Sequence, residues 1–472
     1  MSEDILARLL AADSDEEREW LVLSLSLDNL PPTIRAAAWA AAIPHWFDQA
    51  FLNALLGDTP LSTADFQTLC DLSFVEPLPG RGYNVHERTR SLLLTRLWRD
   101  DPEQYQQLSR YAAIYCATQD QEDTAWRVEW IYHLQIVNPD EGAQQLQYNG
   151  WTWQNSPNFA YDKVELMARL AREHVDAGRM AIRNQGWALF WEAHLDKLYS
   201  RNHAAREKLY KIEINPDIDP WLSANCIKAL GDVHLRLDEY ELARGQYQAA
   251  LPLYREIGDR LGEANCIQAL GDLYGAQKVV DLAVQTLQEA AERFRLLGLK
   301  SNEAGCFNSI GNLYGQEKQY QAAIDAYQRA IQLFPLAMWY RNQVDAYIEL
   351  EQYETAQQVL AVAEQMQPGH PFAFLHRGRI ALWQKQPQEA EAQFRQAVAL
   401  RPQLNSFHFW LAMAFLVQKK FDDAVPAFEQ GLHVTYAAKD IEEAIEELDK
   451  LAQRYALLPQ LDAVYQLLRN RL

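Results

Sequence analysis

Polar side chains recur at a fixed spacing through the middle of the chain, and these are the residues whose types could do recognition chemistry. Asn225 and Asp232 return forty residues later as Asn265 and Asp272, and Asn312 follows after a further forty. Amide side chains offer a donor and an acceptor together, so a row of them suits hydrogen bonding to an extended polypeptide backbone. The full set is Asn225, Lys228 and Asp232, then Asn265, Gln268 and Asp272, then Asn308 and Asn312.

Motifs for catalysis are absent from the sequence. It contains no HExxH, GxSxG or GxGxxG pattern and no phosphate-binding GxxxxGK[ST] loop. The five cysteines form no CxxC pair, and Cys226, Cys266 and Cys306 occupy one recurring position, which favours small core residues over redox or metal chemistry. We therefore expect a non-enzymatic protein with no cofactor, no metal and no catalytic residue.

The net charge of the chain indicates which kinds of partner it can bind. The 472 residues include 44 Lys and Arg against 64 Asp and Glu, a net charge of −20. Such a chain opposes a nucleic-acid backbone or an anionic membrane, so a basic or neutral-apolar protein partner is expected. The most apolar tract, residues 37–48, is interrupted by Pro44 and is too short to span a bilayer. The acidic N-terminal segment has no secretory signal pattern, which favours the cytoplasm.

A repeat organises the same region. Gly231, Gly271 and Gly311 lie forty residues apart, and from Tyr320 onward the step shortens to 33 or 34 residues. Apolar residues recur at spacings of three and four within each unit, which indicates two amphipathic helices. Glycine inside a helix costs about 1 kcal/mol relative to alanine. We therefore predict that a bulky residue of the facing helix lies across each glycine, namely Tyr247, Leu287 and Tyr327.

These units resemble the tetratricopeptide repeat. Six good copies span residues 219–434, and a degenerate one lies near 184–212. The clearest copy carries the pattern at Ile310, Gly311, Tyr314, Tyr320, Ala323, Tyr327, Ala330 and Pro335, and a later copy carries it at Gly378, Ala390, Phe394, Ala397 and Pro402. The resemblance implies an all-α superhelical solenoid that binds a protein partner in its concave groove.

The resemblance also places the recurring polar residues on the groove. Positions six and three before the glycine, and one after it, would face inward. In later copies these positions become apolar, with Leu375, Phe409 and Met413, so a groove polar at one end and apolar at the other is expected. A clamp for a terminal carboxylate, known in some such repeats, is disfavoured because Asp232 stands where an amide is needed. An ordinary solvated groove without a partner is the competing interpretation.

The N-terminal part does not follow the repeat and shows a different pattern of predicted elements. Helical patterns precede two short strand-like runs, 74–78 and 83–86, which flank the turn Pro79–Gly82. Three helices and a hairpin resemble the winged-helix unit of STAND signalling ATPases of the maltose-regulon activator type. The third helix contains Asp65 but no Lys or Arg, so DNA binding is disfavoured. His86, at the position that often reads a nucleotide in that family, is interpreted as a hairpin residue.

We therefore expect an all-α protein with an N-terminal winged-helix-like unit that carries a small β-hairpin. Its expected parts are a winged-helix-like domain over residues 1–115, a helical connector with degenerate repeats over 116–218, a repeat array over 219–434 and capping helices over 435–472. The expected function is a scaffold or adaptor that holds a peptide or helix of a partner. The alternatives are the effector-sensing half of a STAND-type switch that works with a separate ATPase and, less favoured, a DNA-binding regulator.

Overall fold

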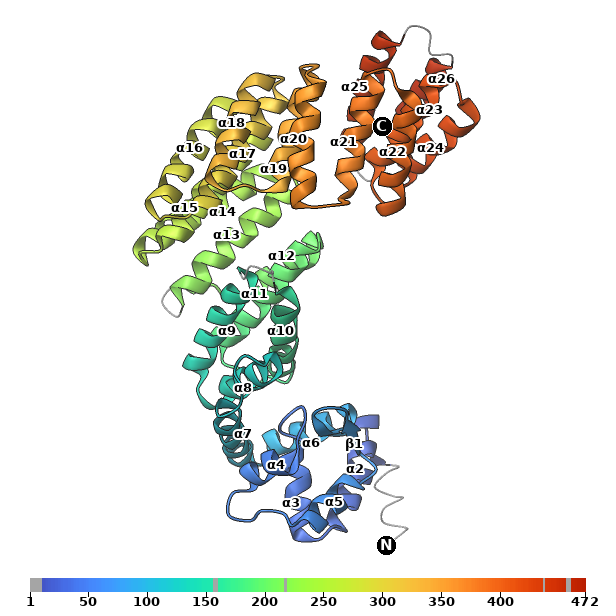
Figure 1. Ribbon diagram of the computed structural model, residues 1–472. Helices are drawn as coiled ribbons and strands as arrows, with labels where there is room; N and C mark the ends of the chain where they lie inside the picture. Colours follow the sequence, from blue (N-terminus) through green and yellow to red (C-terminus); the bar gives the residue numbers. More distant parts are fainter. Residues whose placement is uncertain (1–10, 156–159, 216–218, 436–437, 456–459) are drawn as a thin grey trace. The chain divides into compact units, whose positions relative to one another are not determined.

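The computed structural model describes residues 11–155, 160–215, 219–435, 438–455 and 460–472. In these ranges the chain forms 25 helices and one two-stranded sheet, which confirms the predicted fold class (Figure 1). The chain divides into two compact units, residues 1–253 and 254–472. Among the described residues, no helix is both long enough and apolar enough to cross a membrane.

The first unit begins with four helices, an antiparallel hairpin and two further helices. Val75 pairs with Val85 and Leu78 with Gly82 in the hairpin. Phe47 and Phe51 lie in the core beneath these elements and are fully buried. The elements are α2 Asp15–Asp28, α3 Pro32–Ala41, α4 Gln49–Leu56, α5 Thr63–Cys70, β1 Val75–Leu78, β2 Gly82–Val85, α6 Glu87–Asp100 and α7 Pro102–Ala117.

The rest of the first unit is a series of helices around an aromatic core. Trp187 and Trp191 are fully buried there. Large aromatic side chains of this kind contribute much of the apolar area that a core buries. The helices are α8 Thr124–Val137, α9 Pro139–Gln154, α10 Tyr161–Asp176, α11 Ile182–Leu198, α12 Asn202–Tyr210, α13 Pro220–Arg236 and α14 Tyr240–Glu256, the last of which ends in the second unit.

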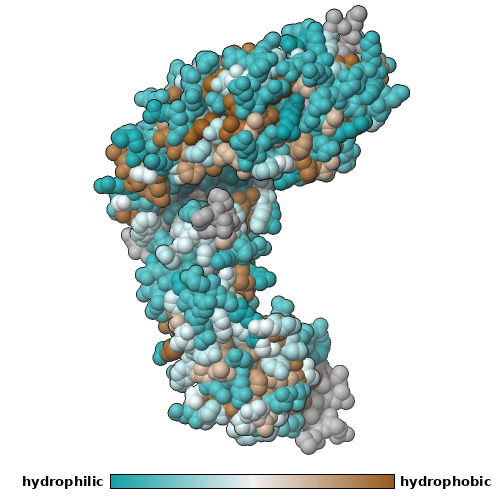
Figure 2. All heavy atoms as spheres, in the orientation of Figure 1, coloured by the Kyte–Doolittle hydropathy of each residue, from teal (hydrophilic) through white to brown (hydrophobic). Residues whose placement is uncertain are grey.

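The second unit consists of successive helical hairpins. Each first helix packs against its own second helix and against the next hairpin. Figure 2 shows mostly hydrophilic residues with scattered hydrophobic ones over the visible face of this unit. The helices are α15 Arg260–Ala276, α16 Val280–Leu296, α17 Lys300–Gln316, α18 Tyr320–Leu333, α19 Ala337–Glu349, α20 Tyr353–Met366, α21 Pro371–Trp383, α22 Pro387–Leu400, α23 Asn405–Val417, α24 Phe421–His433, α25 Ala438–Arg454 and α26 Leu461–Arg469.

The predicted contacts at the recurring glycines are present. A β-carbon placed on Gly231 would lie 2.6 Å from the ring of Tyr247, and one on Gly311 would lie 2.5 Å from the ring of Tyr327. At Gly271 the neighbour is Leu287, at 2.7 Å. These distances are shorter than van der Waals contact, so only glycine lets the two helices of a hairpin approach this closely.

The change of repeat length has a simple structural origin. Helices α15, α16 and α17 each contain 17 residues, whereas α18 to α24 contain 13 or 14. Each helix of the later hairpins is therefore about one turn shorter. The turn between the two helices of a hairpin keeps one geometry throughout, with residues such as Lys278, Lys318 and Lys385 in the left-handed region at φ near 60°.

Candidate functional site

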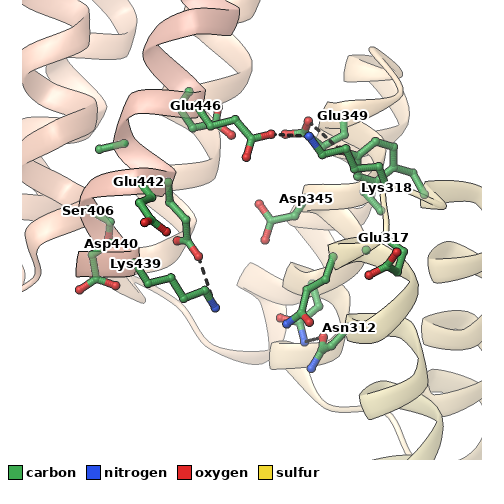
Figure 3. Close-up of a pocket in the computed structure, with 18 of the residues that line it drawn as sticks. Asn312, Glu317, Lys318, Asp345, Glu349, Ser406, Lys439, Asp440, Glu442 and Glu446 are labelled. Carbon is green, nitrogen blue, oxygen red and sulfur yellow. Dashed lines mark hydrogen bonds and ion pairs between the residues drawn. The ribbon is translucent and has the colours of Figure 1, made fainter. Parts of the chain in front are cut away.

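The second unit encloses a cavity of about 900 Å³. Residues of α17, α19, α21, α23 and α25 line it. In Figure 3, Glu442 and Glu446 of α25 lie across the cavity from Asn312 of α17 and Asp345 of α19, and Ser406 of α23 lies on the side of α25. Carboxylates outnumber cations among the lining residues, and Glu317, Asp345, Glu349, Glu442 and Glu446 are all labelled in Figure 3. The cavity is therefore a polar, acidic space on the side of the hairpins where the sequence places recognition residues.

One repeat position supplies a residue to the cavity from four consecutive hairpins. It is the position directly after the packing residue of the first helix, and it is occupied by Asn312, Asp345, Arg379 and Met413. The sequence analysis named Asn312 and Met413 but missed Asp345 and Arg379. The same register would have found them, because Val344 and Gly378 hold the packing position in those two hairpins.

Arg379 is the central cation of the cavity wall. Its guanidinium forms ion pairs with Asp345 and with Glu349, the latter at 3.2 Å, and lies over the ring of Trp410 at 4.9 Å from the centroid. Burial opposes ionisation of Asp345, but the charges of His376 and Arg379 outweigh it and lower the pKa of that carboxyl to about 2. Asp345 therefore stays ionised at neutral pH. The guanidinium of Arg379 and the ring of Trp410 form a cation–π pair in the same wall of the cavity.

Helix α25 forms the opposite wall through charged contacts to earlier hairpins. The Lys318 ammonium lies 2.7 Å from the Glu446 carboxylate, and the Lys450 ammonium lies 2.9 Å from that of Glu349. The Arg454 guanidinium lies 3.0 Å from the Glu351 carboxylate. These pairs join α25 to the ends of α17 and α19, so the cavity is closed by a helix far away in the sequence.

The predicted polar residues of α15 and α17 lie on one surface but not all line the cavity. Asn265, Gln268 and Asp272 are half-buried on α15 and lie outside it. On α17, the Asn308 side chain accepts a hydrogen bond of 2.9 Å from Asn342, and the Asn312 side chain accepts one of 2.9 Å from the Tyr327 hydroxyl. Asn342 also reaches Asn312, at 3.4 Å, so these amides form a connected row.

The apolar residues predicted at the end of the groove are largely buried. Leu375, Phe409 and Met413 are 6%, 3% and 1% exposed. The ring of Phe409 lies against Gly431, 2.6 Å from the place a β-carbon would take. The apolar face of α25 joins the same core. Phe409 and Met413 still line the cavity, so their contact with a partner stays a prediction.

The remaining predicted residues lie in the first unit, on α13. The Asn225 amide donates to the backbone carbonyl of Trp221 at 2.8 Å. The Asp232 carboxylate forms ion pairs with the Lys197 ammonium at 2.7 Å and with the Lys228 ammonium at 3.0 Å. Burial would raise the pKa of Asp232, but these two cations outweigh it and lower that pKa. Lys228 is thus engaged with its own chain.

Chemistry of other kinds finds no support in the described residues. Cys70, Cys116, Cys226, Cys266 and Cys306 are buried and form no disulfide, and burial raises the pKa of Cys70 to about 11 and that of Cys306 to about 12. No cluster of three or more His, Cys, Asp or Glu in these ranges could hold a metal ion. These thiols are therefore poor nucleophiles that act as small core side chains.

The basic residues near the hairpin are engaged in ion pairs within the chain. Arg81 pairs with Asp123 at 2.7 Å, and Arg88 pairs with Glu19 at 2.6 Å. Arg90 is buried and pairs with Glu173. His86 is exposed and precedes α6, which begins at Glu87. The arginines that would be needed to contact phosphates are thus neutralised by carboxylates.

A buried polar cluster joins the N-terminal helices of the first unit to α8 and α10. Glu129 is fully buried and accepts hydrogen bonds from the backbone N–H of His45 at 3.0 Å and from its Nδ1 at 2.8 Å. The other ring nitrogen of His45 lies 3.1 Å from Glu173, which also receives Arg90 at 2.8 Å. Arg90 donates in turn to the Tyr132 hydroxyl at 3.2 Å. Glu129 and Arg90 are buried, whereas the Glu173 side chain is 38% exposed. The dense hydrogen bonding within the cluster favours a structural role.

Burial and specific partners shift the ionisation of this cluster. Burial would raise the pKa of Glu129 and of Glu173, but their histidine and arginine partners outweigh it and lower both. Burial and Arg90 would lower the pKa of His45, but the two carboxylates raise it. Burial lowers the pKa of His133 and, further, that of His174.

These shifts predict how stability depends on pH. Below pH 6.5 the unfolded chain protonates His133 and His174 while the folded chain keeps them neutral, so stability falls with falling pH. His45 acts in the opposite sense, because its contribution is present below pH 6.5 and is lost as pH rises through its raised pKa. Glu129 and Glu173 add a further loss below about pH 4.5. Urea titrations between pH 7 and 4 should show a steady decline, and a shallower one between pH 7 and 5 for His174→Gln. Equal slopes for the two proteins would contradict this assignment.

Comparisons with known proteins agree with this architecture. Models of the tetratricopeptide repeat match residues 223–295, 304–335, 341–405 and 375–433. No curated protein matches the chain. Among solved structures, a signal transduction ATPase with numerous domains (STAND) and a tetratricopeptide repeat sensor, from Pyrococcus horikoshii, is similar over 96% of this chain and 69% of its own, at 14% identity and a TM-score of 0.55.

Two further solved structures cover less of the chain. A tetratricopeptide repeat protein from Parabacteroides merdae matches 58% of this chain and 98% of its own, at 12% identity and a TM-score of 0.42. PilF of Pseudomonas aeruginosa matches 47% of this chain and 94% of its own, at 21% identity and a TM-score of 0.37. The glycine contacts, the hairpin series and the matched models lead to one conclusion: residues 223–433 are an array of tetratricopeptide repeats.

Proposed function

We propose that this protein is a non-enzymatic scaffold that binds a peptide or helix of a partner along the first helices of its repeats. The observation that carries the proposal is the recurrence of one inward position through four hairpins, where Asn312, Asp345 and Arg379 supply polar groups to a single cavity of about 900 Å³. A continuous polar wall of this kind suits a polypeptide, which presents donors and acceptors at regular intervals.

The charge of the wall indicates the kind of partner. Acidic side chains exceed basic ones around the cavity, and Asp345 is held ionised. A segment with basic or neutral side chains is attracted there, and an acidic one is repelled. The amides of α15 and α17, including Asn265 and Asn308, continue the wall beyond the cavity and would hydrogen bond to the backbone of such a segment.

The N-terminal residues 1–115 complete the proposal as a winged-helix-like domain that docks protein. Their ion-paired arginines leave little positive potential for nucleic acid. Residues 116–218 would connect this domain to the array, and residues 435–472 would cap it. A cytoplasmic location, with its reduced thiols, suits the five free cysteines.

A second candidate function is the sensing half of a STAND-type switch. It is favoured by the structural similarity to the Pyrococcus horikoshii protein, which extends over nearly the whole chain. In that case a small effector would occupy the cavity, and the first unit would signal to a separate ATPase. Small molecules that raise the melting temperature of the wild type but not of Arg379→Ala would favour this candidate.

Selection from a random displayed-peptide library tests the scaffold proposal. We expect enriched peptides to be basic or neutral, and their affinity to fall at least tenfold for the triple variant Asn265→Ala, Asn308→Ala and Asn312→Ala. The matched control is Gln285→Ala with Gln288→Ala, which removes two exposed amides from the second helix α16 and should leave binding unchanged. Peptides that bind all three proteins equally would exclude the wall of first helices as the binding surface.

A further inference from the structure

Helix α25 has the pattern of a helix that lies in a groove. Ile441, Ala444, Leu448 and Leu451 recur at spacings of three and four and are 5% exposed or less. They pack in the same core cluster as residues of α21 and α23. Its other face carries acidic residues such as Glu446 toward the cavity. An apolar stripe with charged flanks is the arrangement by which amphipathic helices bind hydrophobic grooves.

The contacts of α25 reach well beyond the neighbouring hairpin. A helix that only caps an array covers the last hairpin, as α25 does where it packs on α23. In addition, Glu446 meets Lys318, which is 128 residues away, and Lys450 meets Glu349, which is 101 residues away. Arg454 donates to the backbone carbonyl of Trp383 at 2.9 Å. Successive turns of α25 therefore engage the ends of α17, α19 and α21, three hairpins in a row.

We infer that α25 is an exchangeable occupant of the groove and that the partner's segment is an amphipathic helix with the same apolar spacing and the same order of ion pairs, but without the excess of acidic side chains that α25 turns toward the cavity. This inference rests on the proposed function, which it makes more specific. The partner helix has apolar residues at the spacing of Ile441, Ala444, Leu448 and Leu451. It places an acidic group against Lys318 and basic groups against Glu349 and Glu351, in that order toward its C-terminus.

The chemistry of the contact allows exchange. The ion pairs between α25 and the earlier hairpins involve partly exposed side chains. Those of Lys318 and Glu446 are 64% and 48% exposed, and that of Lys450 is 32% exposed. Exposed ion pairs contribute little and are weakened by salt. The covalent link keeps α25 at a high effective concentration, so an incoming helix competes only if it makes contacts that α25 does not make. The row of amides on α15 and α17 offers such contacts.

Binding of a labelled peptide with the sequence of residues 438–454 tests the inference on the full chain. In the wild type the groove is filled, and binding should be weak. In Glu446→Lys with Lys450→Glu, α25 meets like charges at Lys318 and at Glu349, and the wild-type-sequence peptide should bind at least tenfold more tightly by fluorescence anisotropy. A peptide that carries the same two changes is the control and should not bind. Circular dichroism shows whether the variant keeps its helical content.

A second variant tests the same point by a covalent link that holds α25 in place. Lys318→Cys with Glu446→Cys can be joined by a short bismaleimide, and the five native thiols are buried and do not compete. The joined chain should lose the peptide binding that the same chain shows before joining. The inference is overturned if the charge-reversed chain is folded and binds no more tightly than the wild type, or if joining has no effect. Library peptides that still depend on Asn265 and Asn308 would then leave the proposed function intact.

Discussion

Replacing Glu129 with leucine is expected to lower the free energy of unfolding by about 3–5 kcal/mol, the usual effect of removing one partner from a buried ionic cluster. The carboxylate is fully buried and accepts two hydrogen bonds from His45, one of them from the backbone. Leucine has a similar size but no acceptor. It therefore leaves the backbone N–H of His45 without an acceptor, and it leaves the imidazole with Glu173 as its one remaining carboxylate partner.

The matched control for this change is Glu122→Leu, which alters an exposed glutamate just before α8. Its effect should stay within about 0.5 kcal/mol, as is usual for surface positions. Urea titration followed by tryptophan fluorescence measures both variants. A Glu129→Leu protein within about 1 kcal/mol of the wild type would show that the cluster contributes little to the first unit.

A pair of glycine changes within α17 should separate packing from helix propensity. Alanine at Gly305 meets no atom within 4 Å, so it should stabilise the second unit by about 1 kcal/mol. Alanine at Gly311 has the same propensity gain, but its β-carbon would lie 2.5 Å from the ring of the nearly buried Tyr327. Overpacking of this kind costs about 1–3 kcal/mol. The two variants should therefore differ by that amount, with Gly311→Ala the less stable.

Thermal unfolding of the two variants side by side checks the comparison. Adding Tyr327→Leu to Gly311→Ala should recover part of the loss, because the ring that the new methyl group meets has been removed. Equal melting temperatures for the two single variants would mean that Tyr327 moves aside without cost, and the argument for glycine at this repeat position would fail.

The repeat array could be predicted from the sequence because local patterns determine it. The spacing of Gly231, Gly271 and Gly311 predicted both the helices and the residues that cover them, because the cost of glycine in a helix demands a close contact. The burial of Cys226 and its equivalents followed from the same register. Both inferences depend only on periodicity and on the size of side chains.

The cavity and its second wall could not be predicted in this way. Phe409 stands at the position of Gln268 and Asn308 in earlier copies, but its ring lies against Gly431 of the facing helix. The position of Gly431 is small in the other copies too, at Ala330, Ala363 and Ala397, so the repeat register alone does not show which way the ring turns. The contact between Glu446 and Lys318 spans 128 residues, and no local pattern specifies such a pairing.

The two helix lengths in the second unit show how such an array can change its size. Hairpins of 17-residue helices join hairpins of 13- or 14-residue helices without loss of the packing at the central glycine or its equivalent. A change by one whole turn returns every side chain to its original face, whereas a single inserted residue would rotate the rest of the helix by about 100°. Helices of these repeats can therefore be lengthened or shortened in steps of one turn. Insertions of other lengths would rotate buried side chains toward the solvent.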